Sequence, residues 1–180
     1  TAASRQLFET DTSAEQNQSP PKKTPGVRSP QQILARQRKA EALYEQAMEV
    51  DFPRMREKLL KQALKQYPEH VDSIIEMGML CDTPAEAMEY IRREAIPLAE
   101  RQIAEHLQHH VGQFSQFEAT GSYLRANERL VRCHLDADQH EAAIEIMKEM
   151  LRLDTDDVMM MREPLLEWYC NLNRIEDAWQ

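Results

Sequence analysis

The chain has 180 residues and a formal net charge of −9, and this acidity argues against a role in binding nucleic acid. Its four glycines and its many Ala, Leu, Glu, Gln, Met and Arg residues predict an all-α protein. Three cysteines, an odd number, lie within apolar helical patterns, so we expect buried reduced thiols in a cytoplasmic protein. The sequence has no stretch that approaches the roughly 20 apolar residues of a membrane span, and we expect no membrane partner.

The first 29 residues are predicted to form a disordered tail. They are rich in Ser, Thr, Gln and Pro, and Pro20-Pro21 and Pro25-Gly26 block regular structure. Leu7 and Phe8 are among the few large apolar residues there, so a docking peptide is the alternative interpretation. The remaining residues, 30–180, are predicted to form one helical-repeat domain, truncated at its C-terminus.

A helical hairpin is predicted to follow the tail. Ser29-Pro30 offers an N-cap followed by a proline in the first turn, and that helix extends to about Val50. Asp51-Phe52-Pro53 ends it, and a second helix covers residues 54–67 before Pro68. Apolar residues recur at three- and four-residue spacings in both helices, which predicts one buried face on each. The residues expected to point inward are Ile33, Leu34, Ala40, Leu43, Ala47 and Met48 in the first helix, and Met55, Leu59, Leu60, Ala63 and Leu64 in the second.

A third helix, at 69–80, and a longer fourth helix are predicted next. Gly78 lies inside the third helix, where close approach of a neighbouring helix would offset its weak helix propensity. Thr83-Pro84 offers an N-cap and a first-turn proline for the fourth helix. Pro97 should kink this helix, although the helical spacing of apolar residues continues to about residue 112.

The helical pattern lapses between residues 113 and 121. Phe114 and Phe117 lie in this predicted loop, and we expect both rings to pack onto the helices. Contact with a ligand is the alternative interpretation of the two rings.

The clearest pattern is a hairpin at 122–157. Its two amphipathic helices are joined by a polar turn at 136–139, which offers an N-cap for the second helix. Neither helix can bury its apolar face alone, which is the situation of a helical-repeat array. Ala143 and Ala178, small residues expected where paired helices come close, are 35 positions apart, near the period of about 34 in tetratricopeptide repeats. The predicted fold is therefore an all-α, tetratricopeptide-like solenoid of helical hairpins with a disordered N-terminal tail.

A Thr-x-x-Tyr-Leu-Arg-Ala segment begins at Thr120, ahead of this hairpin. Four further residues of the same pattern lie around the turn after the hairpin: Leu151, Leu153, Asp157 and Arg162. In these features, and across roughly residues 32–180, the chain resembles the bacterial tetratricopeptide proteins related to suppressor of tumorigenicity seven. The chain departs from the family's pattern at two places in the turn after the hairpin. Thr155 stands where the family has Pro, and residues 158–161 stand in place of the polar, Gly-containing half of the turn. The resemblance implies a repeat fold that serves as a protein-binding platform.

Candidate catalytic and metal-binding residues are few. The spacing of His106, His109 and His110 would let three rings converge on a divalent metal, but no HExxH motif or cysteine pair accompanies them. Solvated histidines at a helix end are the preferred interpretation, and no metal site is predicted. Cys133 and His134 point about 100° apart on a helix, so we expect a core cysteine beside a surface histidine. Without a phosphate loop or a nucleophile motif, we predict no enzymatic activity and no cofactor.

Two surface features suggest binding. Met159-Met160-Met161 is expected at the start of a helix, where three adjacent residues span about 300° and cannot all face the core. Packing in the core and against a further repeat is the preferred interpretation of the methionines, and adaptable partner binding by an exposed face is the alternative. The second predicted helix has a basic face, whereas the chain from Ser122 onward is acidic, so opposite poles could steer a partner or align neighbouring chains. The basic residues are Arg54, Arg56, Lys58, Lys61 and Lys65.

The sequence thus predicts a non-catalytic protein–protein interaction scaffold that binds a peptide or a partner helix. A regulatory or accessory domain of a larger enzyme, with its catalytic part beyond residue 180, is the alternative. The first helix of the central hairpin would line the concave surface of an array, and Arg and Tyr often dominate the energetics of interfaces. We therefore predict a partner-binding patch formed by Tyr123, Arg125, Asn127 and Arg132.

Overall fold

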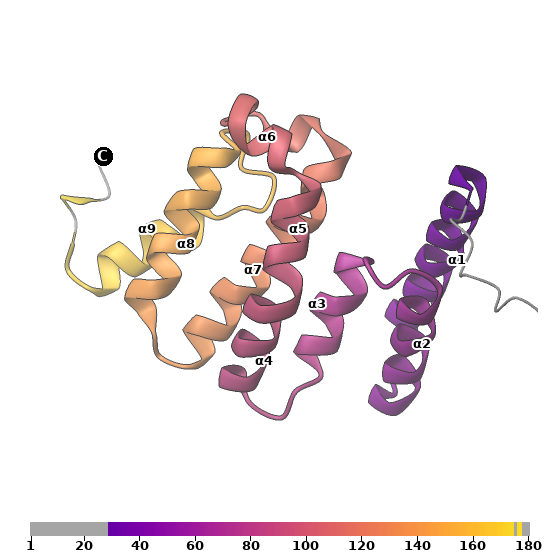
Figure 1. Cartoon of the computed structure of the whole chain (residues 1–180). Coiled ribbons are helices and arrows are strands. Elements are labelled where there is room, and N and C mark those ends of the chain that lie inside the picture. Colours follow the sequence, from indigo (N-terminus) through magenta and orange to yellow (C-terminus); the bar gives the residue numbers. More distant parts are fainter. Residues whose placement is uncertain (1–28, 175, 178–180) are drawn as a thin grey trace, which may run out of the picture.

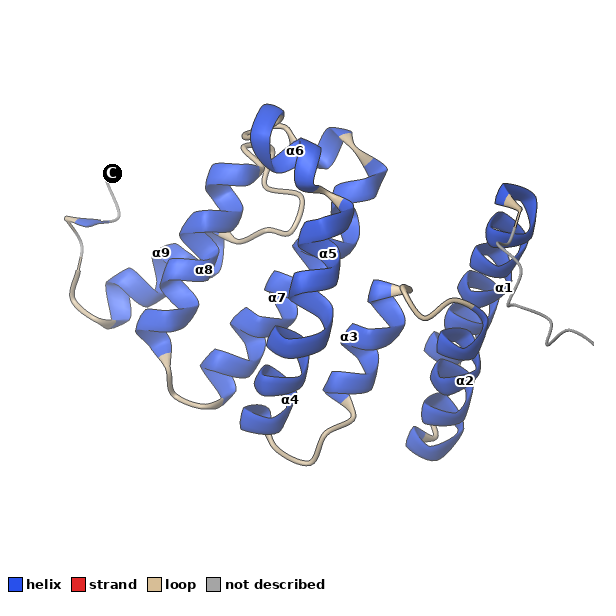
Figure 2. Cartoon of the chain, in the orientation of Figure 1, coloured by secondary structure: helices blue, strands red, loops and turns tan. Residues whose placement is uncertain are grey.

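The computed structural model describes residues 29–174 and 176–177 (Figure 1). Within this part, helices are joined by loops and turns, and no strand is present (Figure 2). The all-α prediction is therefore confirmed for these residues. The predicted disordered tail lies outside the described residues except for Ser29, and so does Ala178, whose spacing from Ala143 suggested the repeat period.

The first hairpin consists of α1 (Pro30–Met48) and α2 (Pro53–Gln66). The predicted cap of α1 is present, because the Ser29 hydroxyl group accepts a hydrogen bond from the Gln32 backbone N–H and the Gln32 side chain accepts one from the Ser29 backbone N–H. The helices pack along each other, and small side chains let them come close. The buried residues of this hairpin are Ala40, Ala47, Leu60 and Ala63.

Three apolar residues of this hairpin that were predicted to point inward are exposed instead. Ile33 and Leu34, in the first turns of α1, are 41% and 47% exposed, and Met55 of α2 is 49% exposed. Among the described helices α1 packs mainly on α2, and α2 makes the main contact with α3. The apolar residues of these two helices therefore form faces wider than the neighbouring helices can bury.

The next pair of helices is α3 (Val71–Met79) and α4 (Pro84–Tyr90). The predicted cap of α4 is present, because Thr83 and Glu86 exchange hydrogen bonds between side chain and backbone N–H in both directions. At the start of α3 the His70 imidazole accepts a hydrogen bond from a backbone N–H of the first turn. Both helices therefore begin at side chains that satisfy their free N–H groups.

Gly78 of α3 lies against the last residue of α4 and the first residue after it. A Cβ atom at this position would lie 2.9 Å from Cγ1 of Ile91 and 3.0 Å from Cδ1 of Tyr90. These separations leave no room for a side chain, so the close approach predicted at Gly78 is confirmed. The glycine costs helix propensity but brings α3 into contact with its neighbour.

The fourth predicted helix is divided into segments. After α4, one π-helical turn (Ile91–Ala95) leads into α5 (Ile96–Gln102), and the distortion directly precedes Pro97. A proline ring clashes with the carbonyl group four residues earlier, and the wider turn relieves that clash. The prediction of continuous helical structure to about residue 112 is wrong beyond α5, because the chain turns before a short helix, α6 (Ala104–His109).

Between α6 and α7 the chain makes two 3₁₀ turns, at Phe114–Gln116 and Glu118–Thr120. The Phe114 ring is fully buried, as predicted for a ring that packs onto the helices. The Thr120 hydroxyl group donates to the carbonyl oxygens of Phe114 and Phe117 at 2.5 and 2.7 Å. These bonds fold the segment back on itself and fix the Phe114 ring in the core.

The central hairpin consists of α7 (Gly121–Asp136) and α8 (His140–Leu153), close to the predicted bounds. In the turn between them Asp138 has a positive φ of 55°. Gln139 precedes α8 without a side-chain capping hydrogen bond, so the predicted N-cap in this turn is wrong. The Gln139 side chain bonds back to α7 instead.

The last helix, α9 (Arg162–Asn171), begins after the three consecutive methionines. The prediction that these methionines start a helix is wrong, because Met160 has a positive φ of 56° and is 67% exposed. The Asp157 carboxylate accepts hydrogen bonds from the backbone N–H groups of Met161 and Arg162, at 2.7 and 3.1 Å. These bonds place the start of α9 after the methionines.

The core has two adjoining parts. The larger part lies among α3, α4, α5 and α7 and contains Ile75, Ile91 and Leu124. The smaller part joins α7 and α8 to α9 and contains Met147 and Leu165. Figure 1 shows the first hairpin at one end of the row of helices and α9 at the other. Among the described helices, none has the length and apolar character needed to cross a lipid bilayer.

Candidate partner-binding surfaces

The four residues predicted to bind a partner lie on two opposite faces of α7. Successive residues of a helix rotate by about 100°, so Asn127 lies near Tyr123, whereas Arg125 and Arg132 lie about 180–200° away. The structure therefore divides the predicted patch into two pairs. Whether either pair binds a partner stays a prediction.

Tyr123 and Asn127 lie on the side of α7 that faces the core. Tyr123 is 8% exposed, and its ring meets the Phe114 ring edge-on, with centroids 6.3 Å apart. Burial raises the pKa of the Tyr123 hydroxyl group. The Asn127 amide group donates to the Tyr123 carbonyl oxygen at 2.9 Å. Both side chains thus have structural contacts within the molecule.

Arg125 and Arg132 lie on the other side, which faces α3 and solvent. The Arg125 guanidinium donates to both oxygens of Asp72 on α3, at 2.7 and 2.8 Å, and the Ser122 hydroxyl group donates to the same carboxylate at 2.7 Å. Arg132 pairs with Glu128 one turn away, and its side chain is 61% exposed. Of the four predicted residues, Arg132 therefore has the most exposed polar group.

The Asp72 carboxylate is the centre of a buried polar contact between α3 and α7. Burial opposes its ionisation, but the hydrogen bonds from Arg125 and Ser122 outweigh burial, and the pKa of Asp72 is lowered. Nearby, burial together with the negative charges of Asp72 and Glu76 raises the pKa of Tyr44 to about 12. The two bonds from one guanidinium fix the position of α7 on α3.

A polar hollow of about 590 Å³ lies next to this contact, between α1 and the start of α3. Glu41 of α1 lies 2.9 Å from the His70 ring, and the Gln102 amide group donates to the Glu69 carbonyl oxygen at 2.9 Å. The first contact connects α1 to the residue before α3, and the second connects α5 to the loop between α2 and α3. Because its lining is mostly polar, this hollow is a weaker candidate for the apolar face of a partner.

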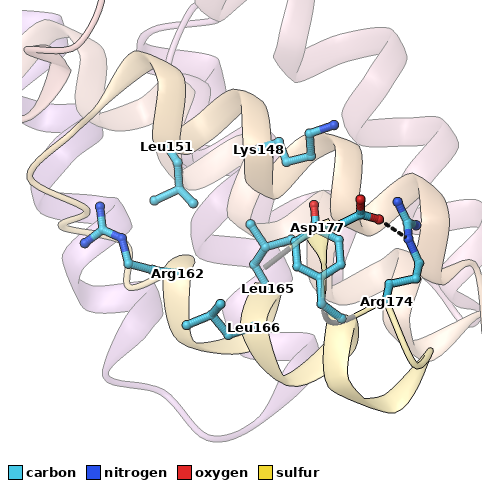
Figure 3. Close-up of a pocket in the computed structure, with 8 residues that line it drawn as sticks. Lys148, Leu151, Arg162, Leu165, Leu166, Arg174 and Asp177 are labelled. Carbon is cyan, nitrogen blue, oxygen red and sulfur yellow. Dashed lines mark hydrogen bonds and ion pairs between the residues drawn. The ribbon is translucent and has the colours of Figure 1, made fainter. Parts of the chain in front are cut away.

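A groove of about 560 Å³ between α8 and α9 has a different character (Figure 3). Figure 3 shows Leu151 of α8 facing Leu165 and Leu166 of α9 across it. Tyr169 also lines the groove, and Leu166 is 42% exposed. Leu165 and Tyr169 are themselves buried and Leu151 is half-buried, so the exposed apolar surface of the groove is mainly that of Leu166.

Charged side chains surround these apolar residues, which form the floor of the groove. Lys148 pairs with Glu145 at 2.9 Å, and Arg174 pairs with Glu141 at 2.7 Å and lies 5.3 Å from the centre of the Tyr169 ring. Arg162 has a weaker contact, 3.9 Å from the Asp157 carboxylate. An apolar floor with charged groups at its rim suits an amphipathic helix or peptide.

The residues of this groove were absent from the predicted patch, although the sequence holds a signal for them. Leu165 and Leu166 are adjacent and point about 100° apart on α9, and Tyr169 follows one turn later. One packed neighbour covers only part of so wide an apolar face. The width of this face could therefore have indicated a second contact surface on α9.

The three candidate metal-binding histidines form an aromatic cluster instead. The rings of His106 and His110 lie 4.6 and 4.4 Å from the Phe117 ring, and both are half-buried rather than solvated as predicted. The His109 ring lies edge-on to His110, at 6.5 Å. In the described part of the chain, no three His, Cys, Asp or Glu side chains are placed to hold a metal ion.

Of the three cysteines predicted to be buried, Cys133 is buried, whereas Cys81 is half-buried and Cys170 is exposed, so that prediction is wrong for Cys170. The prediction of a surface histidine beside Cys133 is also wrong, because His134 is 1% exposed. Its Nε2 accepts a hydrogen bond from Arg92 at 2.6 Å, so the neutral ring carries its proton on Nδ1, which donates to the Gln139 side chain at 2.8 Å. Burial and the Arg92 charge lower the pKa of His134, against the effect of Gln139. The ring thus connects α7 to the π-helical turn.

The sequence matches no family model, and no match was found among curated proteins or among solved structures. The choice between the surfaces therefore rests on their geometry. The face of α7 is engaged in internal bonds, and the hollow beside α1 is polar. The groove between α8 and α9 combines exposed apolar surface with charged side chains, which makes it the strongest candidate site.

Proposed function

We propose that the chain is a non-catalytic protein-interaction scaffold whose groove between α8 and α9 binds the apolar face of a partner helix or peptide. The single observation that carries this proposal is the exposed side chain of Leu166 in a groove whose other apolar lining is the half-buried Leu151 and the edges of the buried Leu165 and Tyr169. Grooves that accept amphipathic helices have an apolar floor, with polar groups at the rim that fix orientation.

The energetics of this groove fit a specific contact. Burying two leucine side chains of a partner on the floor contributes roughly 3–6 kcal/mol before the cost of association. Tyr169 and Arg174 are of the residue types that most often dominate interface energies, and they already lie against each other. The groove would therefore favour partners with two or more apolar residues one helical turn apart.

The same proposal includes a tetratricopeptide-like solenoid as the architecture. Its support is the order of contacts, because α2 packs on α3, α3 on α7, and α8 on α9. A row in which each unit contacts the next is the arrangement of a repeat array. A cytoplasmic location is also part of the proposal, since Cys81, Cys133 and Cys170 are all free thiols.

Affinity capture from a lysate of the source cells, followed by mass spectrometry, tests the proposed groove. Leu166→Glu places a charge on the floor at an already exposed position, so the fold should persist. We expect this variant to lose at least 90% of the partner captured by the full chain. Leu34→Glu is the matched control, because Leu34 is similarly exposed but lies on α1.

A third variant distinguishes binding in the groove from binding on the face of α7. Asn127→Ala with Arg132→Ala removes two residues of the predicted patch, and circular dichroism checks its fold. If the groove is the site, this variant captures the partner at the yield of the unaltered chain. Loss of the partner in this variant, with full capture by Leu166→Glu, would assign the site to α7 and overturn the proposal.

A further inference from the structure

A basic stripe runs along the exposed face of α2. Arg54, Lys58, Lys61 and Lys65 are separated by four, three and four residues, so their side chains share one side of the helix. They line a shallow hollow of about 420 Å³. Lys61 pairs with Glu57 at 2.5 Å. Within the described part of the chain, no carboxylate lies within 4.0 Å of the charged groups of the other three.

An apolar slot of about 320 Å³ adjoins this stripe. Among the residues lining it are Pro53, Met77, Leu80 and Tyr90, and it shares Arg54 and Glu57 with the basic hollow. The two hollows therefore form one continuous surface, apolar at one end and basic along its length. We call it the α2 surface.

One exposed apolar residue directly precedes Pro53, which lines the slot. This residue, Phe52, is 76% exposed. Met55 is 49% exposed but lies on the other side of α2, about 160–200° from Pro53 and Glu57. A ligand for this surface would thus contact apolar groups at one end and cations at the other.

The charge of the rest of the molecule restricts the ligand. Residues 29–67 hold eight basic and five acidic side chains, a net charge of +3, whereas residues 68–177 hold ten basic and 23 acidic ones, a net charge of −13. An acidic ligand is attracted to the α2 surface and repelled elsewhere, which gives a single preferred docking position. A polyanion larger than the stripe, such as a nucleic-acid duplex or an anionic membrane, would also face the negative remainder.

We propose that the α2 surface binds a short acidic protein segment that carries an apolar anchor next to its acidic run. From Arg54 to Lys65 the stripe spans about 16 Å at 1.5 Å per helical residue. An extended peptide rises about 3.3 Å per residue, so about five residues cover it. The anchor enters the slot, and the carboxylates pair with the stripe. This site is separate from the groove between α8 and α9, so each proposal can fail alone.

Fluorescence anisotropy of a labelled peptide, Phe-Leu followed by five Glu, titrated with the full chain, tests this proposal. We expect saturable binding that weakens as salt rises. Lys58→Glu with Lys65→Glu should weaken binding at least tenfold, and the milder Lys58→Gln with Lys65→Gln should give a smaller loss. Arg38→Glu with Lys39→Glu, on the exposed side of α1, makes the same charge change and should alter affinity by less than twofold.

Further ligands test the apolar anchor and the class of partner. Phe52→Ser, or a peptide with Ser-Ser in place of Phe-Leu, should weaken binding at least threefold. The proposal would be overturned if the Phe-Leu peptide did not bind. It would also be overturned if the Lys58→Glu, Lys65→Glu variant and the Arg38→Glu, Lys39→Glu variant lost affinity for the peptide equally. Equal or tighter binding of vesicles rich in phosphatidylserine or of a single-stranded oligonucleotide would overturn it as well. Self-association in sedimentation velocity that the Lys58→Glu, Lys65→Glu change abolishes would assign the surface to a second copy instead.

Discussion

The first and the central hairpins each consist of two antiparallel helices with apolar residues at helical spacing, more weakly segregated to one face in α1, and they are buried to different extents. α7 and α8 bury twelve residues, whereas α1 and α2 bury four. The difference lies in their neighbours, because α7 contacts α3, α4, α5 and α8, while α1 packs mainly on α2. Helical periodicity specifies an apolar face, but a neighbouring element decides whether that face is buried.

This difference indicates where partners can bind. The central hairpin supplies most of its apolar surface to the core, and the Arg125 side chain is bonded to α3. Among the helices and their caps, the exposed large apolar side chains lie in the first hairpin, such as Phe52 and Met55, and at Leu166 in α9. The proposed binding surfaces are therefore at the ends of the row rather than at its centre.

The largest expected effect comes from one substitution made in both hairpins. Leu124→Ala in α7 should lower the free energy of unfolding by about 2–5 kcal/mol, because the side chain is 1% exposed and its removal leaves a cavity. Leu34→Ala in α1 should change it by less than about 0.5 kcal/mol, because that side chain is 47% exposed. Urea denaturation measures both values. Equal losses would contradict the difference in burial.

The ion pair between α7 and α3 should contribute next. Arg125→Ala leaves the Asp72 carboxylate poorly compensated and should cost about 1–3 kcal/mol at pH 7, compared with less than about 1 kcal/mol for Arg132→Ala on the exposed side. The pKa of Asp72 is lowered in the folded state, so its contribution is present above about pH 4 and is lost as the pH falls through the folded pKa. Unfolding curves at several pH values should show that the free energies of unfolding of the two variants become similar under acid conditions.

Gly78→Ala tests the contact of α3 with its neighbour. A methyl group there would overlap Ile91 and Tyr90, so we expect a net loss of about 1–2 kcal/mol, even though alanine improves helix propensity by up to about 1 kcal/mol. Thermal unfolding followed by circular dichroism measures the change. A gain in stability would show that the two segments are not closely packed.

The smallest expected effect is a pH dependence from His134. Its pKa is lowered in the folded state, so between the folded pKa and the ordinary value of about 6.5 the unfolded chain binds more protons. Stability should therefore fall as the pH decreases below about 6.5. His134→Gln should reduce this slope relative to the unaltered chain, and an unchanged slope would contradict the neutral, bonded ring.

Local features of the fold were predictable from the sequence, whereas burial by distant residues was not. The caps at Ser29 and Thr83 and the contact at Gly78 depend on nearby residues and are confirmed. The burial of His134 depends on Arg92, which lies 42 positions away, so no local pattern could indicate it. The start of α9 was misplaced for a different, local reason, because the Asp157 carboxylate accepts from the N–H groups of Met161 and Arg162 and fixes the first turn there.

The candidate sites were predicted only in part. The basic face of α2 was visible in the sequence, although Arg56 departs from it by donating to the Val50 carbonyl oxygen at 3.0 Å. The apolar slot beside that face was not visible, because Met77, Leu80 and Tyr90 reach it from α3, the turn after it and α4. On α7 the residue types suggested an interface, but Tyr123 faces the core and Arg125 is bonded to α3.

Native-state hydrogen exchange of the full chain, followed by mass spectrometry, tests the difference between the hairpins most directly. The buried amides of α7 and α8 should exchange only through global unfolding, and those of α1 and α2 through a local opening of lower free energy, at least tenfold faster. A denaturant series separates the two modes, because only global opening depends strongly on denaturant. Equal protection and equal denaturant dependence in both hairpins would contradict the claim that the first hairpin is the less securely packed one.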